Sequence, residues 1–297
     1  MTNSVLCIIY VDIEHILYIQ HNFLAMFTKT LGATSAHLLT ALAERNQLVF
    51  SITDAQEILG GSYNAALLAL GRLTEAGWLV RLTAGRYAIV PLSSGDAALP
   101  QVNRYIIARE LLGESPYYIS HESALDIHNM LTRPITRVIA TTPRRLKKRE
   151  IMSMSYRFVS APLSSLWGYE SNWVTPYEQV NVSDLERTIL DCLNRPDLCT
   201  GISQVAVGLW MRQDDFKWDI LGHYTQKLGR HSVAQRLGYL LELFDLGTPS
   251  LIENLQKMVA SHYASLDPFL PAQGPYLARW RLRINIEPEA LETIVRT

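Results

Sequence analysis

The chain has 297 residues, a formal net charge of −1, a hydrophobic content of 48% and a charged content of 19%. These values are typical of a globular protein with a buried core, and they argue against a disordered chain. The length favours two domains over one. Because the net charge is close to zero, any surface that binds nucleic acid must come from a local concentration of basic residues.

Residues 1–30 are predicted to form an N-terminal extension. The stretch VLCIIYV is followed at once by Asp12, Glu14 and His15, so the extension lacks the run of about 20 apolar residues that a membrane span needs. It also lacks the basic start and the small-residue cleavage site of a signal peptide. Two interpretations are open, an extra helix or strand packed on the body and a start codon placed too early. We favour the second, with Met26 as the natural first residue.

Residues 31–92 are predicted to contain helices separated by clear stop signals. The first helix is expected near 34–46, where leucines recur at helical spacing, and LVFSI follows it as a short strand. Thr53 and Gln56 form a capping-box pattern at the start of a second helix. The pair Gly60–Gly61 is expected to end that helix.

A third helix and a hairpin complete this region. Ser62 is the expected N-cap of a helix that runs to about Ala76, and Gly77 closes it. Strands at 78–82 and 87–90 flank the turn Thr-Ala-Gly-Arg. The order helix, strand, helix, glycine turn, helix and two strands is that of a winged helix-turn-helix domain, which is therefore predicted here.

A linker and a larger domain are predicted to follow. PLSSGDAALP, which ends at Pro100, is small and polar, so residues 93–101 are the expected linker. Residues 102–297 mix helical and strand-like segments, so the predicted fold class is α+β: an N-terminal winged helix-turn-helix followed by a larger mixed α/β domain. The pattern does not predict a strand order. Helices are expected near 120–131, 183–193, 202–210, 215–228, 231–243 and 249–262, and strands at 136–142, 156–162 and 279–286.

The predicted third helix carries the candidate DNA-reading surface. Such a helix reads base edges in the major groove mainly from its N-terminal half. Asn64 can pair with adenine, and Ala65 and Leu68 can touch a thymine methyl group. Tyr63 is expected to point partly inward. The residues expected in the core are Ala66, Leu70 and Leu73.

Phosphate contacts are expected at the edges of this surface. Ser62 and the helix N-terminus suit a phosphate oxygen, and Arg72 is also expected to meet phosphate. Arg81 and Arg86 flank the wing turn that begins at Thr83, where side chains can reach a minor groove or the backbone. Because acidic and basic residues balance in this domain, one copy alone is expected to bind weakly and in a salt-dependent way.

A basic segment stands out in the second domain, because residues 129–149 contain no acidic residue. It is a candidate surface for a polyanion or for oligomer contacts, and the simpler alternative is a solvated loop. RWRLRIN forms a second basic stripe, in which Trp280 alternates with arginines and is expected in the core. The candidate basic patch comprises Arg137, Arg144, Arg145, Lys147, Lys148 and Arg149, and Arg133 lies in the same segment.

Several stretches resemble catalytic or metal-binding motifs without matching them. SHESALDIH is not a zinc-protease motif, because Leu125 stands four residues after His121. Ser120 is therefore expected to cap a helix, and His128 is expected to be packed or hydrogen-bonded. The cysteines Cys7, Cys192 and Cys199 lack paired spacing and are interpreted as small hydrophobic residues in a reducing cytoplasm.

The acidic block VSDLERTILDCL also favours a structural role. Asp184, Glu186 and Asp191 could hold a metal ion, but Ser183 and Glu186 form a capping-box pattern. The chain contains no phosphate-binding loop and no nucleophile motif. No catalytic residue, metal site or cofactor is therefore predicted, and the chain is not expected to be an enzyme.

Four stretches resemble the AbiE-type antitoxin family of bacterial abortive-infection systems: YYISHESALDIHNM, VNVSDLERTILDCLNRPDLCTGISQVAVGLW, RLGYLLELF and RWRLRIN. The predicted N-terminal winged helix, with its segment LTEAGWLVRLTAGRYAI, is similar to that of the family. The resemblance implies a cytoplasmic type IV antitoxin for phage defence that represses its own operon. Its winged helix would bind inverted repeats in the promoter. Its C-terminal domain would neutralise a nucleotidyltransferase-like toxin encoded next to it, without a stable complex.

Two other hypotheses remain open from the sequence. The first is a solitary transcriptional regulator whose C-terminal domain senses a ligand or a partner. The second is a nuclease-like enzyme that uses the acidic block, which magnesium-dependent cleavage would support. A toxin gene next to this one favours the antitoxin, and its absence favours the solitary regulator. Tight binding to DNA would need self-association of two copies on repeated half-sites or help from the second domain, and no membrane partner is expected.

Overall fold

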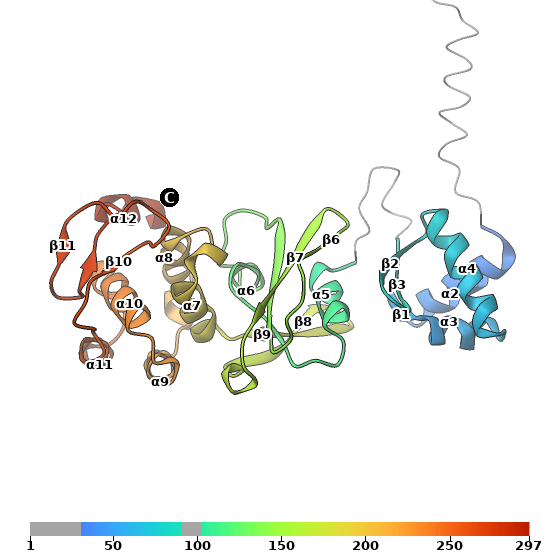
Figure 1. The fold of residues 1–297 in the computed structure, drawn as a ribbon, viewed down its shortest axis with the longest axis horizontal. Helices are drawn as coiled ribbons and strands as arrows, with labels where there is room; N and C mark the ends of the chain where they lie inside the picture. The colour runs from blue at the N-terminus through green and yellow to red at the C-terminus, as the bar shows by residue number, and fades with distance from the viewer. Residues whose placement is uncertain (1–30, 91–101, 297) are drawn as a thin grey trace, which may run out of the picture. The chain divides into compact units, whose positions relative to one another are not determined.

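The computed structural model describes residues 31–90 and 102–296, which mix helices and strands in an α+β arrangement. The chain divides into two compact units, with the boundary between Val102 and Asn103. This boundary directly follows the predicted linker, which itself lies outside the described residues, as does the extension at 1–30. The colours of Figure 1 follow the position of each residue along the chain.

In the N-terminal unit, residues 31–90 form helices packed against a small antiparallel sheet of order β1-β3-β2 (Figure 1). The hairpin β2–β3 turns at Gly85, whose φ of +73° suits glycine. Strand β1 pairs with β3 through Val49 and Ala88. The elements in chain order are α2 (Ala33–Glu44), β1 (Val49–Ser51), α3 (Ile52–Leu59), α4 (Tyr63–Glu75), β2 (Leu79–Thr83) and β3 (Arg86–Ile89).

Local capping sets where these helices begin and end. The hydroxyl of Ser51 accepts the N–H of Asp54 at 3.1 Å, and the Asp54 carboxylate accepts the N–H of Ser51 at 2.6 Å. This capping box starts α3, so the predicted pair Thr53 and Gln56 was wrong by two residues. Gly60 ends α3 in the left-handed conformation, as predicted.

The core of this unit lies between the helices and the sheet. Leu38 and Leu42 of α2 are fully buried, and the rings of Phe50 and Tyr87 stack with centroids 6.1 Å apart. The three α4 residues that the sequence places in the core are all buried. They are Ala66, Leu70 and Leu73.

The C-terminal unit contains a six-stranded mixed sheet of order β6-β7-β5-β4-β9-β8. Its inner pairs β5–β7 and β4–β9 are parallel, and the other pairs are antiparallel. The strands are β4 (Tyr118–Ile119), β5 (Arg137–Thr142), β6 (Arg149–Ile151), β7 (Met154–Ser160), β8 (Tyr169–Thr175) and β9 (Glu178–Ser183). The predicted strands at 136–142 and 156–162 correspond to β5 and most of β7, whereas β8 and β9 were missed.

Helices make up most of the rest of this unit. In Figure 1, the later helices gather together beyond the six-stranded sheet, next to a small sheet of order β10-β12-β11. The helices are α5 (Arg104–Leu112), α6 (Glu122–Ile127), α7 (Leu185–Asn194), α8 (Ile202–Met211), α9 (Trp218–Leu228), α10 (His231–Leu243), α11 (Pro249–Lys257) and α12 (Pro288–Arg296). The short strands are β10 (Ala264–Ser265), β11 (Tyr276–Leu277) and β12 (Leu282–Arg283). Short 3-10 turns are η2 (Leu163–Ser165), η3 (Pro196–Leu198) and η4 (Gln213–Asp215).

Two element predictions in this unit need correction. The predicted helix at 120–131 is shorter and has His121 rather than Ser120 as its N-cap. The predicted strand at 279–286 shrinks to β12, because Arg281 has a φ of +48° that breaks the extended backbone. The alternation within it is nevertheless confirmed, since Trp280 and Leu282 are fully buried. No helix in the described ranges is long and apolar enough to cross a membrane.

Helix α10 packs tightly against the ring of Trp280. Its indole N–H donates to the Glu242 carboxylate at 2.6 Å, and the ring lies across Gly238. A Cβ at Gly238 would come within 2.1 Å of the ring carbons. Only glycine therefore fits at this position of the helix.

We expect Gly238→Ala to lower the free energy of unfolding by about 3 kcal/mol, because the methyl group overpacks a fully buried ring. Gly71→Ala is the matched control, since a Cβ on that α4 glycine meets nothing within 4 Å. The control should gain about 0.5–1 kcal/mol from helix propensity. Urea unfolding measures both changes, and a Gly238→Ala midpoint equal to that of wild type would contradict this packing.

Candidate nucleic-acid interface

The residues expected to read DNA lie on α4 and on the β2–β3 hairpin. The turn Gly60–Ser62 joins α3 to α4, and the hydroxyl of Ser62 accepts the N–H of Ala65 at 3.2 Å. Ser62 is thus the N-cap that the sequence predicts, and it is exposed. Because the first N–H groups of a helix lack partners within the helix, this end is suited to an anion.

The outward face of α4 carries the predicted reading residues. Asn64, Ala65 and Arg72 are exposed, and Leu68 has 63% of its surface accessible. Burial of Asn64 or Leu68 in the core would have excluded contact with bases, and neither residue is buried. The face presents an amide, a methyl group, a leucine and a guanidinium to solvent.

Two exposed residues of α4 were not predicted on this face. Tyr63 is 52% exposed, so about half of its surface is covered, and it presents more surface to solvent than its inward position on the helix suggests. Leu67 is 42% exposed and lies three residues after Asn64, so its helical spacing could have revealed it. The face is therefore more apolar than expected.

The three residues predicted on the wing lie on the β2–β3 hairpin and differ in their exposure to solvent. Arg81 is exposed, and its Nε donates to the carbonyl of Thr83 at 3.3 Å. Thr83 and Arg86 are half-buried and pair across the turn, beside an irregularity in the register. Arg81 thus projects further into solvent than Arg86.

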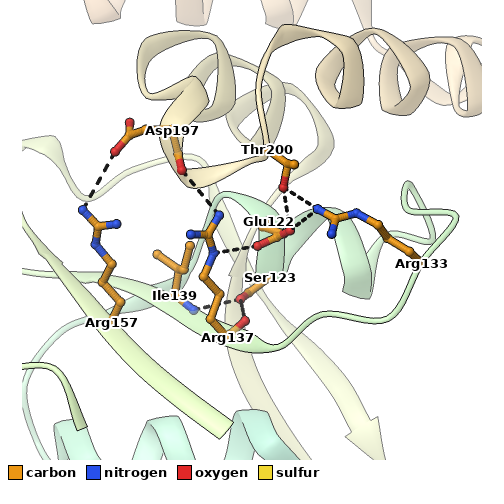
Figure 2. A network of polar contacts seen from close by, with 8 residues as sticks. All are labelled: Glu122, Ser123, Arg133, Arg137, Ile139, Arg157, Asp197 and Thr200. Carbon is orange, nitrogen blue, oxygen red and sulfur yellow. Dashed lines mark hydrogen bonds and ion pairs between the residues drawn. The ribbon is translucent and has the colours of Figure 1, made fainter. Parts of the chain in front are cut away.

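The structure divides the basic segment, and Arg137 belongs to an internal ion-pair network (Figure 2). Its Nε lies 2.7 Å from Glu122 of α6, which is 4% exposed, and Arg133 lies 2.9 Å from the same carboxylate. Thr200 donates to that carboxylate at 3.0 Å. Because two arginines neutralise one buried acid, Arg137 is a structural residue and the prediction that it belongs to a surface patch needs correction.

The other five residues of the candidate patch are exposed, with four on the β5–β6 connection and Arg149 at the first position of β6. Nη1 of Arg144 donates to the carbonyl of Leu112 at 3.1 Å, so it helps to satisfy the C-terminal end of α5. Lys148 forms an exposed ion pair with Glu150 at 2.9 Å. Arg145, Lys147 and Arg149 are the exposed cations of the patch that are not engaged in the contacts just described.

The acidic block of α7 is built into the fold. Asp184 is the N-cap of the helix, so the predicted cap at Ser183 was wrong. Glu186 accepts the N–H of Lys217 at 2.7 Å, and Asp191 forms a buried ion pair with Arg187 at 2.9 Å. Among the described residues, no group of three or more His, Cys, Asp or Glu side chains is arranged to hold a metal ion.

Two buried histidines are also held by their neighbours. Nδ1 of His121 lies 2.8 Å from the hydroxyl of Ser120, and burial lowers the pKa of His121 to about 4. His128 lies 2.6 Å from the carbonyl of Ser183, and burial lowers its pKa too. The prediction that His128 is packed and hydrogen-bonded is confirmed.

Burial raises the pKa of Asp184 to about 6, although the N–H of Arg187 and the hydroxyl of Tyr224 donate to it. This value lies above the pKa of about 3.9 of an aspartate in an unfolded chain, so the folded state binds the proton more tightly. The stabilising contribution of the protonated group is full below about pH 4 and is lost as the pH rises through 6.

We expect Asp184→Asn to be more stable than wild type at pH 8, by at most about 3 kcal/mol, and to differ little at pH 4, since asparagine remains a good N-cap. The contribution of His121 runs the other way and is lost as the pH falls from 6.5 to 4, so the variant must be compared with wild type at each pH. Thr248→Asn, at the N-cap of α11, is the matched control without a titrating group. An Asp184→Asn difference that is independent of pH would contradict this assignment.

Comparisons with known proteins give a shared fold and nothing finer. No family model and no curated protein matches the chain. The chain is similar to the crystal structure of the RV2827C protein from Mycobacterium tuberculosis, with a TM-score of 0.67 and 17% identity. The match covers 91% of this chain and 97% of that one. At this identity the likeness shows the fold alone.

Proposed function

We propose that the N-terminal unit is a winged helix-turn-helix that binds double-stranded DNA, with α4 in the major groove and the β2–β3 hairpin as the wing. The observation that carries this proposal is the solvent exposure of Asn64 and Leu68 on a helix whose other side is anchored by Leu70. Ser62 at the N-terminus and Arg81 on the wing give the polar contacts that position such a helix on the backbone.

The affinity of one copy is expected to be modest. The exposed face of α4 has Arg72 as its cation and several apolar side chains, so few phosphates would be neutralised. Two copies on inverted repeats, or help from the basic residues of the β5–β6 connection, would supply the missing affinity. We therefore expect tight promoter binding only with one of these two additional contributions.

We further propose that the chain is a cytoplasmic type IV antitoxin that represses its own operon and, through residues 102–297, counters a nucleotidyltransferase-like toxin. The support is the sequence resemblance to AbiE-type antitoxins, together with an acidic block on α7 whose side chains are engaged by neighbouring residues. Co-expression with the neighbouring toxin gene tests this role. Growth rescue supports it, and unrelieved growth arrest favours a solitary transcriptional regulator.

Arg145→Ala/Lys147→Ala is expected to weaken DNA binding equally for all sequences and to reduce the slope of log K against log salt by about 2. The physical reason is the loss of two exposed cations from the basic connection. Arg230→Ala/Lys257→Ala removes the same charge from exposed sites elsewhere and should leave the slope nearly unchanged. Fluorescence anisotropy at several salt concentrations measures both, and equal slopes for the two variants would remove the basic connection from the interface.

A further inference from the structure

An apolar groove in the N-terminal unit plays no part in the proposed DNA contact. It has a volume of about 440 Å³ and lies between α2 and the strand β3, with no lining residue from α4. Its walls are almost entirely hydrocarbon, and Thr40 and Glu44 stand among them as the polar members. The apolar lining includes Ala36, Leu39, Ala43, Leu48, Ile89 and Val90.

Helix α2 has two apolar sides, and only one of them is fully buried in the described core. Leu38 and Leu42 are fully buried against α3, α4 and the sheet. Leu39 is partly buried at the edge of this core, and together with its neighbours one turn away it lines the groove, about 100° or more around the helix from Leu38. A helix that is apolar on two sides packs against two partners, because open hydrocarbon surface of this kind is costly in water.

The sequence just before the groove contains an apolar segment that could occupy it. Leu31, the first described residue, lines the groove, so the sequence before it is covalently joined to the groove wall. The five residues Phe23–Phe27 read FLAMF, and Phe27 is four residues from Leu31, a reach of at most about 14 Å. At the other edge, Val90 leads into PLSSGDAALP, which is mostly small and polar and has no aromatic side chain to offer.

We propose that Phe23–Phe27 of the same chain fills this groove and completes the core of the N-terminal unit. The proposal is independent of DNA binding, because the groove and the exposed face of α4 share no residue. It also gives residues before Met26 a structural role, against the sequence-based expectation that Met26 is the natural start.

A disulfide between the segment and the groove tests this directly. The variant Phe27→Cys/Ala43→Cys is made in a Cys7→Ser background, in which the remaining native cysteines, Cys192 and Cys199, are buried. After oxidation, the loss of free thiols gives the disulfide yield, and the mass shows whether one chain or two are linked. The control, Phe27→Cys/His37→Cys, uses an exposed α2 position outside the groove. The proposal predicts a disulfide within one chain at roughly tenfold the yield of the control, since the bond needs Cα atoms within about 7 Å.

The other outcomes each identify a different occupant. A disulfide that links two chains would overturn the proposal in favour of a second copy in the groove. Equal yields for the two cysteine pairs would overturn it in favour of an open groove. A full-length chain that sediments with phosphatidylcholine vesicles, together with low yields, would overturn it in favour of a lipid-bound segment.

A second measurement does not depend on disulfide geometry. Phe23→Ser/Phe27→Ser should raise the emission of an apolar dye such as ANS about fivefold, because the groove is uncovered. Ile8→Ser/Ile9→Ser makes a change of the same kind elsewhere in the extension and should not raise it. An equal rise in both variants, or no rise in either, would contradict the proposal.

Discussion

An Asp191→Asn variant is expected to lose about 3–5 kcal/mol of the free energy of unfolding of the C-terminal unit. Asp191 and Arg187 form an ion pair at 2.9 Å in which both side chains are less than a tenth exposed. Asp191 also accepts the hydroxyl of Tyr118 at 3.0 Å. Removing the carboxylate charge would leave the guanidinium buried without its counter-charge, which costs far more than losing a surface pair.

The controls separate burial from charge. Glu150→Gln breaks the exposed pair with Lys148 and should cost no more than about 1 kcal/mol. Arg187→Met/Asp191→Leu removes both charges and should be less harmful than the single change. Urea unfolding followed by circular dichroism measures all three, and an Asp191→Asn stability equal to wild type would show that the pair is not buried in solution.

The same variant bears on the enzyme hypothesis. A nuclease that used Asp184, Glu186 and Asp191 would lose magnesium-dependent cleavage on mutation of Asp191 and keep its stability. The contacts of these residues lead us to expect the reverse, a loss of stability and no cleavage by the wild-type chain. Magnesium-dependent cleavage by wild type that Asp191→Asn abolishes in folded protein would revive that hypothesis.

On its promoter, Asn64→Ala is expected to bind about 1–3 kcal/mol more weakly, and on random duplex it should bind almost as well as wild type. The amide of Asn64 is exposed on α4, where a bidentate contact to adenine would carry sequence preference. Arg86→Ala should instead weaken binding to both DNAs alike, because a wing arginine contacts the backbone.

Asn254→Ala, which changes an exposed asparagine on α11, is the control for a general effect on folding. Fluorescence anisotropy with the promoter fragment and with a shuffled duplex measures the discrimination of each variant. If Asn64→Ala and Arg86→Ala lose specific and random binding to the same degree, α4 is not the helix that reads the bases.

The parts of the fold that follow from local chemistry could be predicted. Ser62 as N-cap, the glycine stop at Gly77 and the stripe that ends at Leu73 predict α4 almost to the residue. The start of α3 was placed two residues late, because Ser51 with Asp54 and Thr53 with Gln56 both fit the same pattern. Local signals therefore locate a helix better than they choose between adjacent caps.

Interactions between distant segments could not be predicted. The parallel pairing of β5 with β7 and of β4 with β9 is set by the fold, since strand composition carries no partner identity. The basic segment has no acid of its own, yet Arg137 is paired by Glu122, which precedes that segment and lies beside it only after folding. Counting charges along the chain therefore predicted a larger exposed basic patch than the structure has.

Retardation of the DNA upstream of its own gene tests the central claim most directly. Full-length protein should retard the promoter fragment in a gel at physiological salt, and unlabelled promoter should compete better than a shuffled duplex of equal length. A promoter fragment that migrates unretarded, or one that shuffled duplex displaces equally well, would contradict the assignment of α4 to the major groove.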